Sequence, residues 1–474
     1  MLSLFILLPF FCLIAVNLPV KGARRLAFWL TASLFVLQIL AVLLHPSVFW
    51  GMKEDLFANF FAINFSVNNL SLVIFLTIGI VGLVSLIIGK YTLANRPDRF
   101  HFTNLLLTAL IGMNALALLT DLFSMYVFIE VTALSSFILI AVQREKTALE
   151  GAFKYLIIST IASALMLSSV ALILLVSGST SFDVVSAALK ASSGSVFVKL
   201  AVALFLCGPF IKSGLVPFHG WLPDAYSAAP SAVSVLLAGI ITKVSGVYVL
   251  MKLVMSVFGF TPVIRDILMF AGALSIVFGA LAAIGQKDFK RMLAYSSISQ
   301  VGYIIIGLGC GTKLAIAGAA LHFFNHAVFK SLLFTNAAVM EQKLGTVDMD
   351  KMGGLTSRMP FTGMTSLIAF LSTAGIPPLS GFWSKLLIVV ALWTSGMHGY
   401  AAIALLASVL TLAYFLSMQR RVFFGKLRPG LEAVQEAGTG LVITQVALAL
   451  VILGVGLGFP FMLKTLAPLK NILW

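Results

Sequence analysis

Charged residues are scarce in this sequence: they make up 10% of its 474 residues, whereas 60% are hydrophobic. Acidic residues are the scarcer kind, with 16 Asp and Glu against 31 Lys and Arg. A soluble domain is about one quarter charged, and water does not tolerate so large an apolar surface. The composition therefore excludes a soluble enzyme, a disordered chain and a nucleic-acid binder. It also disfavours an outer-membrane barrel, and a polytopic helical membrane protein remains.

Cysteine and cofactor motifs are also scarce. Cys12, Cys207 and Cys310 lie singly inside apolar segments and form no CxxC pair or disulfide framework, so we interpret them as small core residues. The sequence has no Walker loop, no dinucleotide fingerprint and no haem or iron–sulfur motif. We therefore expect no cofactor, no metal site and no redox or hydrolytic chemistry of its own. Whether the chain counts as an enzyme depends on the complex that it joins.

Long apolar runs dominate what is present. A membrane-spanning helix needs about 20 apolar residues, and we predict about 14 spans from such stretches. They run at about 2–20, 26–45, 70–89, 103–120, 122–142, 150–176, 196–222, 229–258, 263–284, 290–309, 312–340, 361–394, 398–424 and 439–463.

The positive charges orient these spans. No positive charge precedes the first stretch, so it is not a signal peptide, and Lys21, Arg24 and Arg25 follow it. Cytoplasmic loops carry an excess of Lys and Arg, which places this end of the first span in the cytoplasm. Alternation from there puts most of the basic loop residues on the cytoplasmic side. We expect a multi-pass protein of the cell (inner) membrane with both termini on the outer (periplasmic) side.

Two spans carry residues that a straight helix cannot contain. The first break surrounds Lys212, which is flanked by Pro209, Gly214 and Pro217, because proline removes an amide donor and clashes one turn back. The second break is at Ser372-Thr-Ala-Gly-Ile-Pro-Pro-Leu-Ser-Gly-Phe-Trp-Ser-Lys385. Discontinuous helices are common sites of ion handling in transporters. We favour proton exchange at Lys212 over a snorkelling lysine because it lies well inside its span.

The two breaks lie about five spans apart, which predicts two five-helix repeats. An odd number of spans in each repeat forces inverted topology. We therefore predict N-terminal helices 1–3 at 1–102, a first repeat of helices 4–8 at 103–258, an inverted second repeat of helices 9–13 at 263–424, and helix 14 at 439–474. The broken helices are numbers 7 and 12.

Ionisable residues inside apolar runs are costly and are functional candidates by default. Glu130 is the one acid deep in such a run; it either forms a structural ion pair that pins two helices or controls the charge of a partner lysine. Lys243 lies in mid-span between small residues that let helices approach closely, and we predict a relay role. Lys154 is near the start of its span, where function and snorkelling are equally supported.

Three residues with spacing i, i+4, i+8 share one helix face: His322, His326 and Lys330. Two histidines with this spacing could bind zinc, but no third or fourth ligand is evident. A structural hydrogen bond is a second alternative. We favour a proton relay because histidine titrates near neutral pH and both of its nitrogens can take part.

The sequence resembles the antiporter-like subunits of respiratory complex I and their relatives in Mrp cation/proton antiporters and membrane-bound (group 4) hydrogenases. The resemblance covers almost the whole chain and is most specific in four stretches. They are Lys212–Ser231, which contains the further site candidate His219, Asp288–Gly302, His322–Phe334 and Gly375–Lys385.

The resemblance implies fourteen core helices, two inverted repeats and the following matches. Glu130 matches the fifth-helix glutamate that pairs with the seventh-helix lysine, here Lys212. Lys243 matches the central lysine of the eighth helix. His322 and His326 match polar positions of the eleventh helix, and Lys385 matches the twelfth-helix residue near the exit. The chain stops soon after the last span, so we expect a member without the long lateral helix.

Three hypotheses for the function follow from these residues. The first is a proton-translocating, or Na⁺-translocating, subunit of a redox-driven complex, in which a driving partner alters the Glu130–Lys212 interaction. The second is a subunit of an Mrp-type Na⁺/H⁺ antiporter. The third, a self-contained transporter of an organic solute, fits lines of Lys and His poorly. We expect other membrane subunits as partners, including homologous antiporter-like subunits, together with the lipid bilayer and no nucleic acid.

Overall fold

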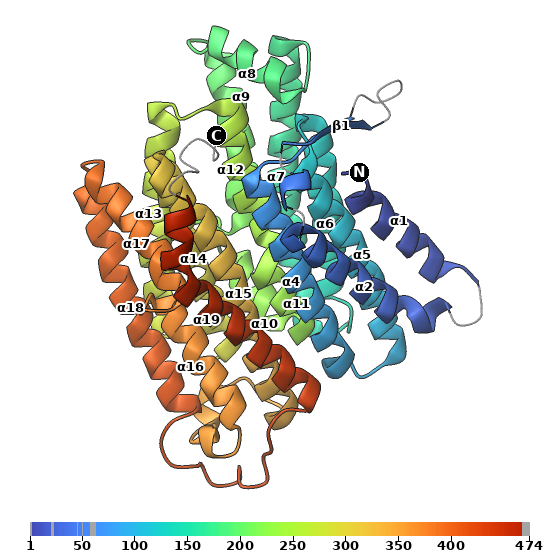
Figure 1. The fold of residues 1–474 in the computed structure, drawn as a ribbon, viewed down its shortest axis with the longest axis vertical. Helices are drawn as coiled ribbons and strands as arrows, with labels where there is room; N and C mark the ends of the chain where they lie inside the picture. Colours follow the sequence, from blue (N-terminus) through green and yellow to red (C-terminus); the bar gives the residue numbers. More distant parts are fainter. Residues whose placement is uncertain (1, 20–22, 45, 50, 57–62, 467–474) are drawn as a thin grey trace. The chain divides into compact units, whose positions relative to one another are not determined.

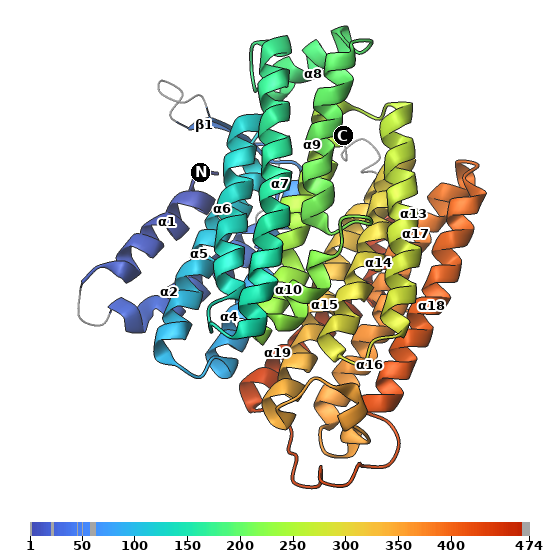
Figure 2. The same ribbon diagram turned by 180° about the vertical axis from the view of Figure 1, so that it is seen from behind.

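The computed structural model describes residues 2–19, 23–44, 46–49, 51–56 and 63–466. Within these ranges the chain is almost entirely helical (Figures 1 and 2), so the predicted polytopic, helical fold class is confirmed. Each of the fourteen predicted stretches falls on one or more helices. Among the described residues, 11 helices are long and apolar enough to cross a membrane.

Three of the predicted stretches do not meet that standard as single helices. The first forms α1 (Leu4–Asn17), which has only 14 residues. The stretch at 312–340 forms α15 (Lys313–Leu344), whose central His, Asn and Lys side chains make it less apolar. The stretch at 361–394 divides into α16 (Pro360–Ala374) and α17 (Ser380–Thr394), with 15 residues each. The stretch at 312–340 falls short because polar side chains lie within α15. The stretch at 361–394 falls short because a break divides it into two helices.

The chain forms two compact units. The first comprises Met1–Leu86, Asn95–Gly214 and Ile240–Pro262, and the second comprises Ile87–Ala94, Leu215–Gly239 and Val263–Trp474. The division into N-terminal helices, two repeats and a last helix, and the inversion of the repeats, stay predictions. The last predicted segment, 439–474, forms α19 (Thr439–Leu466), and residues 467–474 lie outside the described part, as does Lys21.

Local sequence signals delimit the helices of the first unit. Pro97 lies in the first turn of α5, where its missing amide costs nothing. Asp121 accepts a hydrogen bond from the amide of Ser124 and caps α6. Gly178, with φ of +67°, ends α7. The elements are α2 (Ala23–Leu44), α3 (Pro46–Phe49), α4 (Asn69–Thr92, whose last residues belong to the second unit), α5 (Arg96–Leu118), α6 (Leu122–Ile140), α7 (Lys146–Ser177), α8 (Phe182–Ala191), α9 (Val196–Ser213), η2 (Lys243–Tyr248), α12 (Val249–Leu253) and η3 (Val254–Phe258).

The first unit also contains a small β-hairpin that the sequence does not predict. Strands β1 (Lys53–Leu56) and β2 (Ile63–Ser66) pair antiparallel, with Lys53 opposite Ser66. The carboxylate of Glu54 on β1 accepts hydrogen bonds from the Ser3 hydroxyl at 2.5 Å and from the Leu2 amide at 2.5 Å. Burial alone would raise the pKa of Glu54, but hydrogen bonds to its carboxylate, these two among them, outweigh it and lower the pKa to about 2. The hairpin is thereby tied to the residues just before α1.

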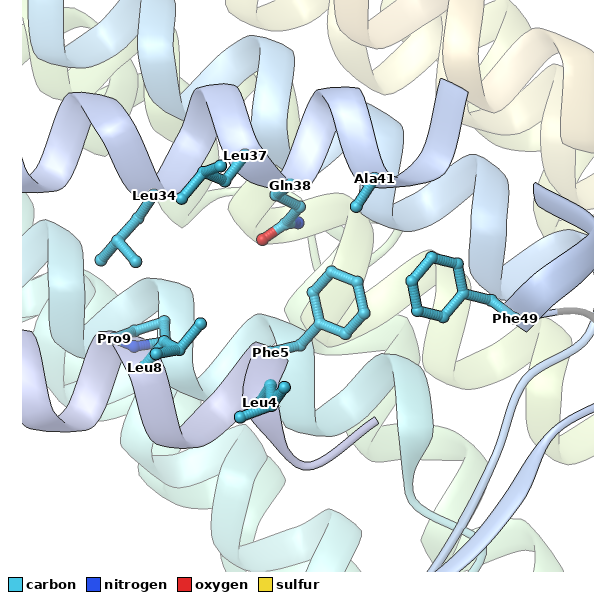
Figure 3. Close-up of a pocket in the computed structure, with 9 residues that line it drawn as sticks. All are labelled: Leu4, Phe5, Leu8, Pro9, Leu34, Leu37, Gln38, Ala41 and Phe49. Carbon is cyan, nitrogen blue, oxygen red and sulfur yellow. The ribbon is translucent and has the colours of Figure 1, made fainter. Parts of the chain in front are cut away.

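An apolar cavity of about 170 Å³ lies between α1 and α2 in the first unit (Figure 3). Leu4, Leu8 and Leu37 line it and are also exposed at the surface. Its one polar lining side chain, Gln38, donates hydrogen bonds to the carbonyl of Phe75 and to the side chain of Asn114. The cavity therefore offers contacts for an apolar group.

The helices of the second unit show the same capping chemistry. Asp288 caps α14 by accepting from the Arg291 amide, and Thr312 caps α15. Gly311 and Gly345, both with positive φ, follow the last residues of these two helices. The elements not yet given are α10 (Trp221–Ala228), α11 (Ser231–Leu236), η1 (Leu237–Ile241, which reaches into the first unit), α13 (Pro262–Ile284), α14 (Phe289–Cys310), η4 (Met349–Lys351), η5 (Leu355–Ser357) and α18 (His398–Val422).

Both units expose large apolar side chains. Leu175 is 83% exposed, Val196 is 76% exposed and Phe461 is 72% exposed. Water disfavours apolar surface of this kind, whereas lipid tails and membrane partners accept it. Together with the spanning helices, this surface identifies a multi-pass membrane protein.

Candidate functional site

A buried lysine–glutamate pair lies within the first unit. The Lys212 ammonium on α9 is 3.2 Å from Oε1 of Glu130 on α6. The Lys212 side chain is fully buried, whereas the Glu130 side chain is 27% exposed. The structure thus brings these two sequence-predicted residues together, and Glu130 is the member whose side chain is partly exposed.

Two serines of α7 connect this pair, and sequence reasoning missed them. The Lys212 ammonium donates to the Ser159 hydroxyl at 2.7 Å. The Ser163 hydroxyl donates to Glu130 Oε1 at 2.5 Å and also to the Ser159 carbonyl. Their i, i+4 spacing in an otherwise apolar span was the available signal, because it places both hydroxyls on one helix face.

The helix that carries Lys212 ends where the sequence predicts a break. α9 contains Pro209 and stops at Ser213, and Gly214 follows with a left-handed φ of +66°. The next helix, α10, begins only at Trp221. Lys212 therefore lies in the last turn of α9, where free carbonyl groups favour a positive charge.

Lys243 lies close to the same helix end. It is 1% exposed and begins the π-helical segment η2, a distortion that occurs often at functional sites. A Cβ atom on Gly246, one turn further along η2, would lie 2.6 Å from the Ser213 amide nitrogen. Only glycine permits this approach, which brings the Lys243-bearing segment against the end of α9.

The second unit contains a separate polar line that starts at the two histidines of α15. His322 and His326 are fully buried, with parallel rings whose centroids are 6.2 Å apart. His322 Nδ1 is 2.9 Å from the hydroxyl of Ser384 on α17. The amide of Asn325 donates to the carbonyl of Ser380 on α17. His322, the first residue of the predicted face, thus contacts the second half of the broken helix.

Lys385 follows Ser384 and occupies the second break. Its ammonium donates to the Thr373 carbonyl at 2.8 Å, in the last turn of α16, just before Gly375 ends that helix with φ of +86°. It also lies 3.4 Å from the Ser408 hydroxyl and 4.5 Å from the centre of the Tyr303 ring. The break therefore leaves carbonyls without helical partners, and the Lys385 ammonium donates hydrogen bonds to them. The face of the Tyr303 ring stabilises the positive charge of Lys385.

The other three candidates, Lys154, Lys330 and His219, differ in their surroundings. Lys154 forms an i, i+4 ion pair with Glu150 at 2.7 Å and is 44% exposed, which is typical of a surface pair. Lys330 is fully buried and donates to the Leu293 carbonyl at 3.0 Å. His219 lies in the first break, with its ring centroid 4.4 Å from that of Phe278.

Lys252, near the end of the predicted span at 229–258, was not among the predicted site residues, yet in the structure it is only 5% exposed. Its ammonium donates to the carbonyls of Leu116 and Ala117 in the last turn of α5. It also lies 5.6 Å from the centre of the Tyr248 ring. The signal that could have identified it is its position in an apolar run of more than twenty residues.

Lys290, at the start of α14, is a second lysine outside the predicted site, and it too is buried, at 1% exposed. Its ammonium is 2.6 Å from Glu341 at the end of α15, and Glu341 also accepts from the Ser231 hydroxyl. Beside this pair, burial raises the pKa of Asp288, against the lowering effect of the Arg291 amide. An ionic cluster therefore joins the ends of α11, α14 and α15.

No metal site accompanies these groups in the part of the chain that the structure describes. Among residues 2–466, apart from the short undescribed gaps, no group of three or more His, Cys, Asp or Glu is placed to hold a metal ion. The arrangement instead offers ammonium, imidazole, hydroxyl and carboxylate groups, which exchange and conduct protons.

Comparison with known proteins places the chain in a family. Residues 120–411 match the family described as NADH:quinone oxidoreductase/Mrp antiporter, TM. The chain belongs to this family. The matched segment includes Glu130, Lys212, Lys243, His322, His326 and Lys385, so the resemblance predicted from the sequence is confirmed.

Individual relatives agree with this assignment. The chain is 35% identical to a subunit of the Na(+)/H(+) antiporter of Alkalihalophilus pseudofirmus over 73% of this chain and 70% of that protein. It is 32% identical to NADH-quinone oxidoreductase subunit N of Desulforudis audaxviator over 92% of this chain and 89% of that protein. A chain in the Mrp complex from Dietzia sp. DQ12-45-1b has the same fold, with a TM-score of 0.89, 24% identity and 98% and 96% coverage of the two chains. The protein is thus an antiporter-like membrane subunit, and its relatives are subunits of multi-subunit, ion-translocating complexes.

Proposed function

We propose that this chain is a proton-translocating subunit of a redox-driven membrane complex, similar to complex I or to a group 4 hydrogenase. The observation that carries the proposal is the Lys212–Glu130 pair, in which a fully buried ammonium at a helix break meets a partly exposed carboxylate. A buried charge in a membrane is retained mainly for function. The proposed partners are other membrane subunits, including homologous antiporter-like ones.

The accessible side of Glu130 explains how a partner drives transport. At 3.2 Å, the interaction of two opposite charges in a partly buried site is worth several kcal/mol, roughly 4 kcal/mol or more before desolvation is counted. A neighbouring subunit that attracts or displaces the Glu130 carboxylate withdraws this stabilisation from the Lys212 ammonium. Lys212 then gives up its proton, and the return of Glu130 restores the ammonium.

The proton then moves along the remaining carriers in the proposed order Lys243, His322 and His326, and Lys385. Support comes from within each unit. In the first, the Lys243-bearing segment packs against the end of α9, through Gly246 and Ser213. In the second, Ser384 bonds to His322 and directly precedes Lys385. Water molecules at buried hydroxyls, such as those of Ser213 and Ser331, complete the connections between side chains.

The orientation that fits this function has both termini on the outer side of the cell (inner) membrane. Its support is the positive-inside pattern of the basic loops. Among the described residues that carry it are Lys90, Arg144, Lys287, Lys343 and Arg420, all on the side proposed to be cytoplasmic.

A second candidate function is that of a subunit in an Mrp-type Na⁺/H⁺ antiporter. The observation that favours it is the 35% identity to the Na(+)/H(+) antiporter protein of Alkalihalophilus pseudofirmus. In that function the same Lys and His line carries the proton, and Na⁺ is the counter-ion. Both candidates use the geometry of Glu130 and Lys212 in the same way.

Isolation of the native complex separates the two candidates. We expect a tagged chain, extracted from its own membranes in mild detergent, to copurify with subunits that give iron–sulfur signals in electron paramagnetic resonance. A complex with no iron–sulfur signal and with small membrane subunits only would contradict the redox-driven assignment. That outcome would establish the Mrp-type alternative.

A further inference from the structure

A strongly basic cavity lies at the beginning of two spanning helices in the first unit. It has a volume of about 800 Å³, which is within the range of known ligand sites. Arginine side chains and two aromatic rings line it: Arg24, Arg25, Arg96, Arg99, Phe28 and Phe100. None of the described residues that line it is acidic, and Arg24 lies over the Phe100 ring at 5.1 Å.

The chemistry of the lining selects a phosphate group. Arginine presents a planar fork of donors that binds phosphate oxygens in a bidentate manner, and it remains charged at every relevant pH. Two of the arginines come from the start of α2 and two from the start of α5, so they approach an anion from two helices. Four arginines in one cavity concentrate positive charge there, which attracts an anion.

The surroundings indicate that this phosphate group belongs to a lipid. Just beyond the arginines, α2 exposes Leu26 to 54%, Trp29 to 64% and Leu30 to 39%. Tryptophan is typical of the membrane–water interface, which places the arginines at headgroup level and the leucines at acyl-chain level. A soluble anion would gain nothing from such an apolar surface.

The same helix also leads to a place for an acyl chain. Leu37 is 57% exposed, lines the apolar cavity between α1 and α2 (Figure 3), and lies seven residues after Leu30 on the same helix face. From Arg24 to Leu37 is thirteen residues, or about 20 Å along a helix. That length is comparable to one leaflet of the hydrocarbon core, roughly 15 Å.

We infer that the basic cavity between α2 and α5 binds the headgroup of an anionic phospholipid, with an acyl chain lying along α2 toward the apolar cavity. Basic pockets between spanning helices are suited to such headgroups. The site lies at the start of α2 and α5, and neither helix carries a residue of the proposed proton path. A failure of this proposal would leave the proposed function untouched, and the reverse also holds.

Native mass spectrometry of the purified full-length chain tests the proposal. The probe is dioleoyl phosphatidylglycerol, with dioleoyl phosphatidylcholine and inorganic phosphate for comparison. We expect the double variants Arg24→Gln/Arg25→Gln and Arg96→Gln/Arg99→Gln each to bind phosphatidylglycerol about tenfold more weakly. The control Arg420→Gln/Arg428→Gln removes the same charge outside this cavity and should bind as the wild type does. Because the two test variants alter different helices, a folding defect in one leaves the other informative.

Three results would overturn the inference. One is equal binding of phosphatidylglycerol by the wild type and by both test variants. Another is displacement of phosphatidylglycerol by millimolar inorganic phosphate, which would show a site for a free anion. The third is normal lipid binding by the test variants combined with failure to assemble with partner subunits, which would show a docking site for an acidic protein.

Discussion

Replacement of Lys212 by methionine is expected to reduce ion translocation by the assembled complex about 10²-fold or more, because a proton carrier is lost. Methionine approximates the length of the buried side chain but cannot bind a proton. Glu130 is partly exposed and retains the Ser163 hydroxyl, so the pair can lose its ammonium without an isolated buried charge. We therefore expect the complex to assemble, and proton movement into sealed vesicles is the measurement.

Two further variants separate function from structure at this position. Lys154→Met removes an exposed lysine of α7 that is paired to Glu150 on the surface, and its translocation should stay near the wild-type rate. Lys212→Arg keeps the ion pair but does not release a proton, since arginine is not deprotonated in proteins. Full translocation by Lys212→Arg would show that charge pairing, rather than proton exchange, is what Lys212 supplies.

Replacement of Lys385 is expected to have an effect of the same size. Lys385→Met removes the last proposed proton carrier and also leaves the Thr373 carbonyl, at the break after α16, without its ammonium donor. Unpaired buried carbonyls cost about 1–3 kcal/mol, so this variant should also unfold at a lower temperature. We expect translocation to fall by about 10²-fold or more, measured by proton movement into vesicles.

Lys385→Arg separates the loss of the proton carrier from the loss of the hydrogen-bond donor. Arginine can still donate to the carbonyls, but it holds its proton. Its thermal unfolding should be closer to that of the wild type, whereas its translocation should be as low as that of Lys385→Met. If Lys385→Arg translocates normally, Lys385 acts only as a cap of the broken helix. A matched control is Lys313→Met, at the exposed start of α15.

The helical class and the breaks were predictable from the sequence because composition and proline chemistry act locally. Apolar runs predict where spans lie, and Gly214, with its left-handed φ, marks the end of α9, although Pro209 lies inside that helix. The close approach of Lys212 to Glu130 is different in kind, since residues 82 positions apart meet only after three helices have packed. The resemblance to known proteins, rather than any local pattern, pointed to that pair.

The positions of other charged side chains could not be predicted for a related reason. Lys154 lies inside an apolar stretch yet is exposed, whereas Lys252 and Lys290, at the ends of predicted spans, are buried. Burial of a side chain depends on which helix face packs against a neighbour. A charged side chain near a helix end can therefore point into the protein or toward its surface. Ser159 and Ser163 were missed because hydroxyls are common in apolar spans and only their partners make them functional.

Proton movement by the assembled complex carrying Lys243→Ala tests the central claim most directly. Lys243 is buried, is not a member of the Glu130–Lys212 pair and follows Lys212 in the proposed path. In sealed vesicles driven by the native energy source, the account predicts that the wild-type complex moves protons while Lys243→Ala moves almost none. Unchanged proton movement by an assembled Lys243→Ala complex would contradict the account, because the path would then not pass through this lysine.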